Sequence, residues 1–422
     1  MIADYVIRNI GELWTQEHVP PIKGALMNDV CVLVNAFLAV QGDIIIGYGT
    51  GPGIDFIGPK TVLQDARGAV VVPGLVDGHT HLVHAGSREQ ELALKLAGVS
   101  YLDILKQGGG ILSTVAATRK ASFEELFAKA KKSLDTMLAF GVTTVEAKSG
   151  YGLNYETEKK QMLVARALDE MHPVDVVSTY LGAHALPAER AGDRVGYLQE
   201  VMRDLEKIKA AKLAESVDVF CEAGVFSVEA ARTLLGYAQS LGFRIRLHAE
   251  EIVAIGGAGL AAELHAASAD HLTAVADQDI LALAGSDVVC DLLPGTSFYL
   301  NHSYAPARRL IAAGAAVAIA SDYNPGSCPS ENFQFTMQLA ANQMKMTAGE
   351  VLTAATLNPA FHLGRSARIG SIAVGKQADF VLFDAPNFPY VLYHFGVNHV
   401  KEVYKNGRCV VKDGMIVREE TI

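Results

Sequence analysis

Two histidines stand two residues apart where a hydrophobic run ends, in the stretch VVPGLVDGHTHLVHAGSRE. Residues i and i+2 of a strand project from the same face, about 7 Å apart. The imidazoles of His79 and His81 can therefore reach one point if the strand end opens into a cavity, which is the spacing of metal ligands. A pair of turn histidines satisfied by water or backbone is the alternative, so the rest of the chain has to decide.

The elements that would position these histidines are visible from residue 69 onwards. Short β-branched or apolar runs alternate there with longer segments of helical periodicity, which predicts β-α units around a parallel sheet. The eight runs lie at 69–77, 141–148, 173–183, 216–223, 243–250, 266–272, 286–293 and 315–322. We therefore expect an α/β fold with a closed (β/α)8 TIM-like barrel over residues 67–362.

The two ends of the chain have a different pattern. Residues 1–66 and 363–422 contain short alternating segments, and Asn406-Gly407 is a strong hairpin turn. We expect these ends to pair into one small β-sandwich domain beside the barrel, with residues 1–66 as its N-terminal part and 363–422 as its C-terminal part.

Reactive side chains gather at one end of the predicted barrel. In barrels of this type the chemistry lies on loops that leave the C-terminal ends of the strands. The residues found at these ends are His79, His81, His184, His248, His271 and Asp322. A random scatter of 13 histidines would not favour one rim so strongly, which favours the metal hypothesis.

Three imidazoles and one carboxylate, from His79, His81, His248 and Asp322, suit Zn²⁺ or a similar ion with one coordination position left for water. Such an ion lowers the pKa of bound water towards about 7 and polarises a carbonyl. Hydrolysis is the chemistry that this donor set predicts.

Composition limits the class of partner. Half of the 422 residues are hydrophobic, and the net charge of −10 argues against nucleic acid or an anionic membrane, so a small-molecule substrate is expected. The five cysteines are scattered without a CxxC pair, which fits a reducing cytoplasm. The N-terminus lacks the pattern of a signal peptide, and no apolar run is long enough to cross a bilayer, so a soluble cytoplasmic protein is expected.

Over nearly its whole length the chain resembles the metal-dependent amidohydrolase superfamily, through PGLVDGHTH, the histidines after the fifth and sixth strands and the aspartate after the eighth. Within it, the chain is similar to the imidazolonepropionases in SREQEL, YLDILKQGGGILSTV, EAKSGYGL, LGAHALP, HAEE, SADHL, LLPGT and SDYNPGS. The strings KSGYGL and DYNPGS are much more specific than HTH.

The resemblance implies hydrolysis of the ring amide of 4-imidazolone-5-propanoate to N-formimidoyl-L-glutamate in histidine degradation, by a homodimer. It also implies one Zn²⁺ or Fe³⁺ ion per subunit. Many amidohydrolases hold two metals through a lysine after the fourth strand, but the run at 216–223 has no lysine. Lys148 ends the second strand instead, where a structural or supporting role is expected.

Several residues suit the propanoate group of that substrate. Arg88 can offer a bidentate fork to the carboxylate, although a rim salt bridge with Glu89 or Glu91 is an alternative. Tyr101 and Tyr151 could add hydroxyl donors, and Tyr151 is the one that the resemblance places in the binding site.

Proton transfer has its own candidates. Glu251 can accept a ring N–H and pass a proton to the departing nitrogen, while His184 can donate to the carbonyl oxygen. The family motif favours Glu251, whereas spacing alone leaves Glu250 nearly equal. Water activation is assigned to Asp322 and His271, with an orienting role as the alternative for His271.

The loop after the eighth strand should wrap the substrate, with an amide from Asn324 and backbone N–H groups from Gly326 and Ser327. One rival function is a mononuclear deaminase or another cyclic amidohydrolase acting on a heterocycle, which would not need the carboxylate clamp of Arg88. A non-catalytic metal-bound scaffold is the other, and loss of a metal ligand would favour it.

Overall fold

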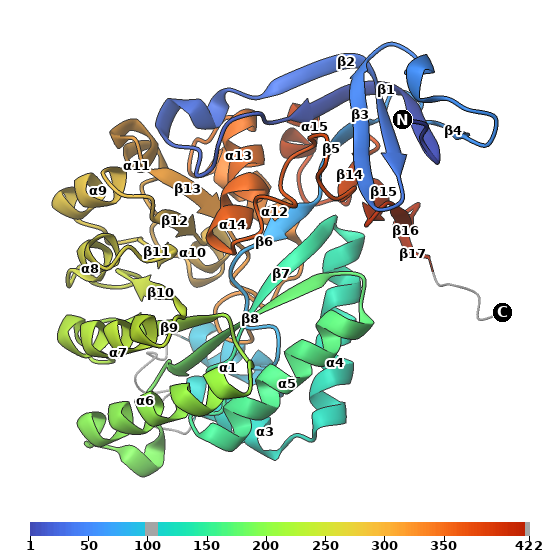
Figure 1. Ribbon diagram of the computed structural model, residues 1–422. Helices are drawn as coiled ribbons and strands as arrows, with labels where there is room; N and C mark the ends of the chain where they lie inside the picture. The colour runs from blue at the N-terminus through green and yellow to red at the C-terminus, as the bar shows by residue number, and fades with distance from the viewer. Residues whose placement is uncertain (98–108, 418–422) are drawn as a thin grey trace.

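The computed structural model describes residues 1–97 and 109–417 and contains two sheets (Figure 1). Eight parallel strands form a barrel covered by helices, and nine further strands from both ends of the chain form a second sheet beside it. The expected TIM-like barrel with a small β domain from the termini is confirmed.

Each of the eight predicted runs contains one strand of the barrel. These strands follow one another around the sheet in chain order: β6 (Leu75–Asp77), β7 (Val142–Lys148), β8 (Asp175–Ala183), β9 (Ser216–Cys221), β10 (Arg244–Ala249), β11 (Ser268–His271), β12 (Val289–Leu292) and β13 (Ala316–Ile319). Because the strands are parallel, their C-terminal ends meet at one rim of the barrel.

Helices connect the barrel strands and cover their outer side (Figure 1). The described helices that follow barrel strands are α1 (Glu89–Leu96), α3 (Ile111–Lys120), α4 (Phe123–Ala139), α5 (Tyr155–Met171), α6 (Arg194–Ala210), α7 (Val228–Ser240), α8 (Gly257–Glu263), α9 (Asp277–Ala284), α10 (Pro294–Leu300), α11 (Ala307–Ala313), α12 (Phe333–Asn342), α13 (Ala348–Ala355) and α14 (Leu357–His362). Ser122 and Glu125 form a capping box at the start of α4, which satisfies backbone N–H groups of its first turn.

The first predicted run is divided between the two sheets. Residues 70–73 form β5 (Val70–Pro73), which pairs with β1 (Tyr5–Thr15) and β14 (Phe380–Phe383) of the second sheet, and only Leu75–Asp77 belongs to the barrel. The chain crosses at Gly74, where an added Cβ would lie 2.3 Å from Thr143 Oγ1. The expectation of one barrel strand over the whole run was therefore wrong. The sequence gives no sign of the division, because both halves are buried and equally apolar.

The second sheet is one continuous hydrogen-bonded sheet. It also contains β2 (Cys31–Gln41), β3 (Ile44–Thr50), β4 (Val62–Asp65), β15 (Val400–Lys405), β16 (Arg408–Lys412) and β17 (Met415–Ile416), and α15 (Phe388–Tyr393) lies between β14 and β15. The predicted turn at Asn406 and Gly407 joins β15 to β16, with φ angles of 50° and 74°. Positive φ at both central residues is what a tight hairpin with this dipeptide needs.

An ion pair between a buried lysine and a partly exposed aspartate ties this sheet to the barrel. Lys405 of β15 places its Nζ 2.8 Å from Asp175 Oδ2 at the start of β8 and 2.6 Å from Asp379 Oδ2. The main hydrophobic core also runs across the junction, since Val381 and Val403 belong to the same cluster as Val142 of the barrel.

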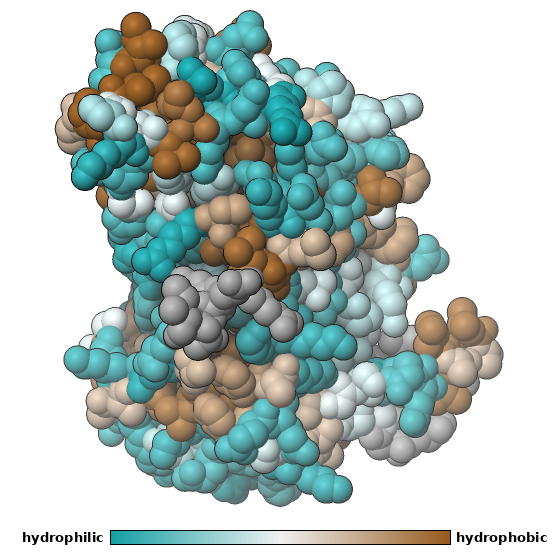
Figure 2. All heavy atoms as spheres, turned by 90° about the vertical axis from the view of Figure 1, so that its right-hand side faces the viewer, coloured by the Kyte–Doolittle hydropathy of each residue, from teal (hydrophilic) through white to brown (hydrophobic). Residues whose placement is uncertain are grey.

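The surface on the side of the second sheet is mostly hydrophilic, with an apolar patch in the upper part of the view (Figure 2). The exposed apolar side chains of the N-terminal segment include those of Met1, Ile2, Ile54, Val62 and Leu63. Among the described residues, no helix has the length and hydropathy to cross a membrane.

The barrel closes between its first and last strands through the segments that follow them. The N–H of His81 donates to the Tyr323 carbonyl at 2.9 Å, and the N–H of Asp322 donates to the His79 carbonyl at 3.0 Å. Asp77, at the end of β6, accepts hydrogen bonds from both the N–H and the hydroxyl of Ser321. This closure places the histidine pair directly beside Asp322.

Candidate metal centre and active site

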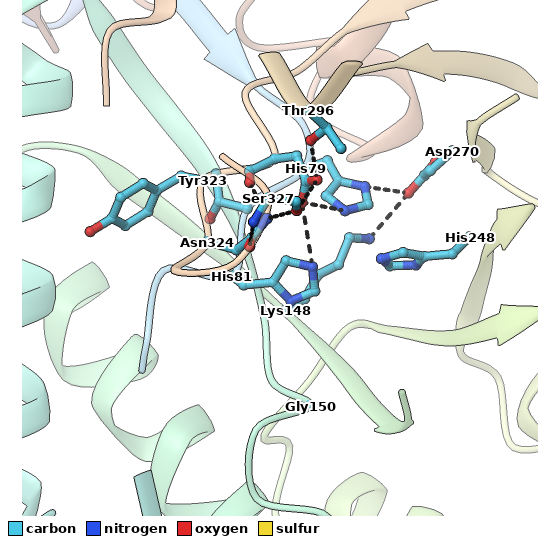
Figure 3. Close-up of polar contacts among 12 residues, drawn as sticks. His79, His81, Lys148, Gly150, His248, Asp270, Thr296, Tyr323, Asn324 and Ser327 are labelled. Carbon is cyan, nitrogen blue, oxygen red and sulfur yellow. Dashed lines mark hydrogen bonds and ion pairs between the residues drawn. The ribbon is translucent and has the colours of Figure 1, made fainter. Parts of the chain in front are cut away.

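Three buried imidazoles meet at the C-terminal rim of the barrel (Figure 3). His79 and His81 follow β6 and His248 lies near the end of β10, and one ring nitrogen from each lies within 4.8 Å of the others. The strand geometry expected for the histidine pair thus brings in a third histidine from across the barrel.

The donor atoms in this cluster fit a metal ion. The Nε2 atoms of His79 and His248 are buried and have no hydrogen-bond partner among the described residues. Asp322 Oδ1 lies 3.6 Å from the Nε2 atoms of both His79 and His81. Two ligands at zinc bond lengths and a tetrahedral angle would be about 3.4 Å apart, so the spacing suits a shared ion.

Two of these imidazoles contact a carboxylate through their second ring nitrogen, Nδ1. Asp270 Oδ2 lies 2.8 Å from His79 Nδ1, and Asp218 Oδ2 lies 3.0 Å from His248 Nδ1. The hydrogen bond between His79 Nδ1 and Asp270 fixes the tautomer in which His79 Nε2 carries the lone pair for a metal, and the nearby Asp218 carboxylate favours a proton on His248 Nδ1. Sequence reasoning missed Asp218 and Asp270, and the available signal was a charged residue inside an apolar strand run.

Lys148 lies between these two carboxylates, at the end of β7. Its ammonium is fully buried beside Asp218, Glu146 and Asp270. Burial alone would lower the pKa of Lys148, but Asp218, Glu146 and Asp270 together raise it above its ordinary value. The lysine is therefore held as a cation.

Asp322 is held in an unusual backbone conformation. Its φ angle is 53°, in the left-handed region that costs a residue other than glycine about 1 kcal/mol or more. Thr296 Oγ1 donates to Asp322 Oδ2, which leaves Oδ1 facing the histidines. Burial raises the pKa of Asp322 to about 6, and a bound cation would favour its ionised form.

The two neighbouring glutamates have separate environments. Glu250 has a φ of 52°, and its carboxylate accepts backbone N–H groups from Gly256, Gly257 and Ala258 at 2.6–2.9 Å. Glu251 instead places Oε2 3.7 Å from His271 Nε2. Burial, with Asp322 nearby, raises the pKa of Glu251 to about 7. The turn at Glu250 thus separates a loop-holding carboxylate from one that faces the site.

His184 lies over His81, with ring centroids 4.9 Å apart and nearly parallel planes. Its Nδ1 donates to the Gly150 carbonyl at 3.0 Å, so the neutral ring presents Nε2 as an acceptor. Burial and His248 lower the pKa of His184 to about 3. Donation from Nε2, as expected from the sequence, therefore requires the protonated ring.

Tyr151 lies against the same histidines, and its ring centroid is 5.4 Å from that of His184 and 5.5 Å from that of His81. The loop that carries it is held by Glu158, whose carboxylate accepts the N–H groups of Gly150, Gly152 and Leu153 at 2.7–2.8 Å. The motif KSGYGL thus encodes a loop built around a buried carboxylate.

Arg88 reaches the loop that follows β13. Its Nε donates to Thr114 Oγ1 at 2.8 Å, and its Nη1 would be 2.2 Å from a Cβ added to Gly326. Among the described residues, neither Glu89 nor Glu91 forms an ion pair with Arg88; they accept hydrogen bonds from Ser87 and from the Gly110 N–H. The rim salt bridge considered as an alternative is not formed.

The loop from Asp322 to Ser327 is organised by Asn324. Asn324 Oδ1 accepts the N–H groups of Gly326 and Ser327 at 2.7 and 2.8 Å, and its Nδ2 donates to the Asp322 carbonyl and to Ser327 Oγ. The two backbone donors expected to bind substrate are thus directed to Asn324 within this loop. Tyr101 lies outside the described residues.

Known proteins resemble this chain along its whole length. Residues 70–417 match the model of the amidohydrolase family. An imidazolonepropionase of Alkaliphilus oremlandii is 53% identical, covering 99% of this chain and 100% of the relative. Another, from Fusobacterium nucleatum, is 51% identical over 98% of this chain and 100% of its own length. The chain belongs to the imidazolonepropionases of the amidohydrolase family.

Solved structures place this imidazolonepropionase family member in the same fold as more distant enzymes. An adenosine deaminase from Xanthomonas campestris, described with bound zinc, gives a TM-score of 0.71 at 21% identity, over 99% of this chain and 95% of the other. An N-isopropylammelide isopropylaminohydrolase from Burkholderia multivorans gives 0.71 at 18% identity, over 99% and 100% of the two chains. At these identities the likeness concerns the fold.

Replacement of His248 by alanine tests the metal centre. We expect the His248→Ala variant to lose most of its bound ion, because one of three converging imidazoles is removed and Asp218 loses its contact with that imidazole. Elemental analysis of the purified protein measures this. A His265→Ala variant, changed at a histidine of the turn after α8, is the control and should keep its ion. Full occupancy in His248→Ala would remove His248 from the metal site.

Proposed function

We propose that this chain hydrolyses the ring amide of 4-imidazolone-5-propanoate to N-formimidoyl-L-glutamate, a step of histidine degradation. The supporting observation is one loop, residues 322–327, that links the metal donors to a cation for the propanoate. Asp322 begins this loop beside His79 and His81, and Gly326 lies against the guanidinium of Arg88. The relatives named imidazolonepropionase support the choice of substrate.

One Zn²⁺ or Fe³⁺ ion would be held by His79, His81, His248 and Asp322. When bound, such an ion lowers the pKa of water and polarises a carbonyl oxygen. Asp322 then accepts a proton from the attacking water, and its closeness to both histidines of the pair keeps its carboxylate at the reacting centre. His271 lies next to Glu251 and orients that carboxylate or the water.

Arg88 binds the propanoate carboxylate. A guanidinium can form two parallel hydrogen bonds to a carboxylate. Thr114 accepts the hydrogen bond from Nε of Arg88 and fixes the side chain, so the two terminal nitrogens remain for the propanoate. Tyr151, packed against both His81 and His184, forms the adjoining wall. Tyr101 completes the same group of substrate contacts in this proposal.

Glu251 transfers the proton between the substrate ring and the departing nitrogen. A carboxyl with a pKa of about 7 can accept a ring N–H as a carboxylate and later return a proton to the departing nitrogen. His184 stabilises the oxygen that becomes negatively charged, and it does so in its protonated form because Nδ1 is already bound to Gly150. Negative charge on the substrate favours that form.

The loop of Asn324, Gly326 and Ser327 contributes a preformed wall. Its internal hydrogen bonds hold the backbone in shape before substrate arrives, which lowers the entropy cost of binding. If the N–H of Gly326 or Ser327 donates to the substrate, it gives up its present hydrogen bond to Asn324.

The first test is turnover of 4-imidazolone-5-propanoate, generated in place from urocanate by urocanase and followed by its ultraviolet absorbance. Metal-assayed parent protein should consume it, and Asp322→Ala should not, because that variant lacks both a metal donor and the proposed base. If metal-replete parent protein is inert, the substrate assignment falls, and a panel of heterocyclic deaminase substrates would be tried next.

Arg88→Met tests the clamp. We expect substrate binding to weaken by about 2 to 5 kcal/mol, since the propanoate would be buried without its cation, while ion content stays at the parent value. Gly326→Ala should raise KM in the same direction, because its Cβ would displace Nη1. Steady-state kinetics measure both variants. Kinetics equal to those of the parent in Arg88→Met would take this residue out of the site.

Glu251→Gln tests proton transfer. We expect the ion to be retained and turnover to fall by about 10² or more, because an amide cannot shuttle the proton. In the parent, kcat/KM should decrease as the pH falls through about 7, where the raised pKa makes Glu251 lose its carboxylate form. Glu250→Gln is the comparison and should mainly lower the thermal midpoint. Normal turnover of Glu251→Gln would transfer the role elsewhere.

A further inference from the structure

A buried lysine lies behind the metal centre, and nothing in the hydrolysis uses it directly. Lys148 Nζ is 2.7 Å from Asp218 Oδ2 and 3.3 Å from Asp270 Oδ2, and all three side chains are fully buried. Figure 3 shows the contact between Lys148 and Asp270. Lys148 Nζ also lies 3.0 Å from Glu146 Oε2. The ammonium is therefore shared among carboxylates from β7, β9 and β11.

Two of these carboxylates contact histidines that we propose as metal ligands. Asp218 contacts Nδ1 of His248 and Asp270 contacts Nδ1 of His79, at 3.0 and 2.8 Å. Lys148 thus contacts both carboxylates, and each carboxylate contacts one imidazole whose Nε2 is unpartnered among the described residues. Two histidines from opposite parts of the barrel are connected through one cation.

The charges inside the barrel require this cation. Glu146 has a second buried partner, because Arg246 Nε lies 3.3 Å from its Oε1. Asp270 and Asp218 have Lys148 as their shared buried ammonium. Two carboxylates left together in a low-dielectric interior repel each other, and removing one partner of a buried ion pair leaves an uncompensated charge.

We propose that Lys148 is a positioning residue for metal binding. Its ammonium holds Asp218 and Asp270 in place, so that Asp218 stays beside Nδ1 of His248, Asp270 accepts the hydrogen bond from Nδ1 of His79, and both Nε2 atoms are left for the ion. In the part of the chain that the structure describes, the side-chain hydrogen bonds and ion pairs of Lys148 all go to carboxylates. The inference rests on the proposed metal site, but its test needs no substrate, so its failure is distinguishable from failure of the proposed reaction.

The chain offers a matched control. Lys405 is also a buried lysine between two carboxylates, with Nζ 2.8 Å from Asp175 Oδ2 and 2.6 Å from Asp379 Oδ2, but it lies in β15 of the second sheet. Lys148→Met and Lys405→Met therefore both remove a buried ammonium that pairs with carboxylates. Both should lower the thermal midpoint, whereas Lys148→Met alone should affect the ion.

The measurement is Zn²⁺ affinity, by competition with a chromophoric chelator, together with the visible spectrum of the Co²⁺-substituted protein. Changing a partner that orients a metal ligand typically costs 10–100-fold in metal affinity, and we expect about 10-fold or more for Lys148→Met. Its Co²⁺ spectrum should shift, and Lys405→Met should match the parent in both readouts. Parent-like affinity in Lys148→Met, or an equal loss in Lys405→Met, would overturn the proposal.

A double-mutant cycle with Asp270→Asn shows whether the lysine acts through the carboxylate. The double variant Lys148→Met/Asp270→Asn also removes one charge of each sign, which protects folding if Lys148→Met alone is unstable. We expect the double variant to lose less Zn²⁺ affinity than the sum of the two single losses, because they interrupt the same contact. Where Lys148→Met does not fold, Lys148→Gln replaces it in the cycle. Strictly additive losses would contradict positioning through Asp270.

Discussion

Pairing between the segments after β6 and β13 closes the barrel, and the candidate metal centre depends on this closure. Two backbone hydrogen bonds join His81 to Tyr323 and Asp322 to His79. The two histidines after the first strand and the aspartate after the last strand are therefore held together by the backbone. An open sheet would leave the first and last strands at opposite edges. Here the same contacts that complete the barrel set the spacing between the histidine pair and the carboxylate.

Buried carboxylates give the loops around this centre their shape. Glu158, Glu222 and Glu250 each accept several backbone N–H groups from loops that follow barrel strands. An N–H group buried without an acceptor costs about 1 to 3 kcal/mol, so each carboxylate stabilises one loop conformation over its alternatives. Tyr151 and Glu251 lie on segments without regular secondary structure. The backbone of these segments is nevertheless fixed, because its N–H groups are bound to buried carboxylates.

The sequence predicted the eight strands and the meeting of His79, His248 and Asp322 at one rim, because strand periodicity and parallel topology determine both. It did not predict the division at Gly74, since Val70 and Val76 are equally apolar and buried. It also left Glu250 and Glu251 nearly equal, because the positive φ of Glu250 depends on hydrogen bonds to residues 255–258. The contact between Arg88 and Gly326 joins distant segments and has no local signature.

The crossing of the chain at Gly74 has a mechanical consequence. Strand β5 is hydrogen-bonded inside the second sheet and continues within one residue into β6 of the barrel, while Lys405 bridges the same junction through Asp175. A hinge at this boundary would have to break strand pairing and the ion pair between Lys405 and Asp175 together. The two sheets therefore act as one rigid frame, and any widening of the entrance for substrate has to come from the loops at the barrel rim.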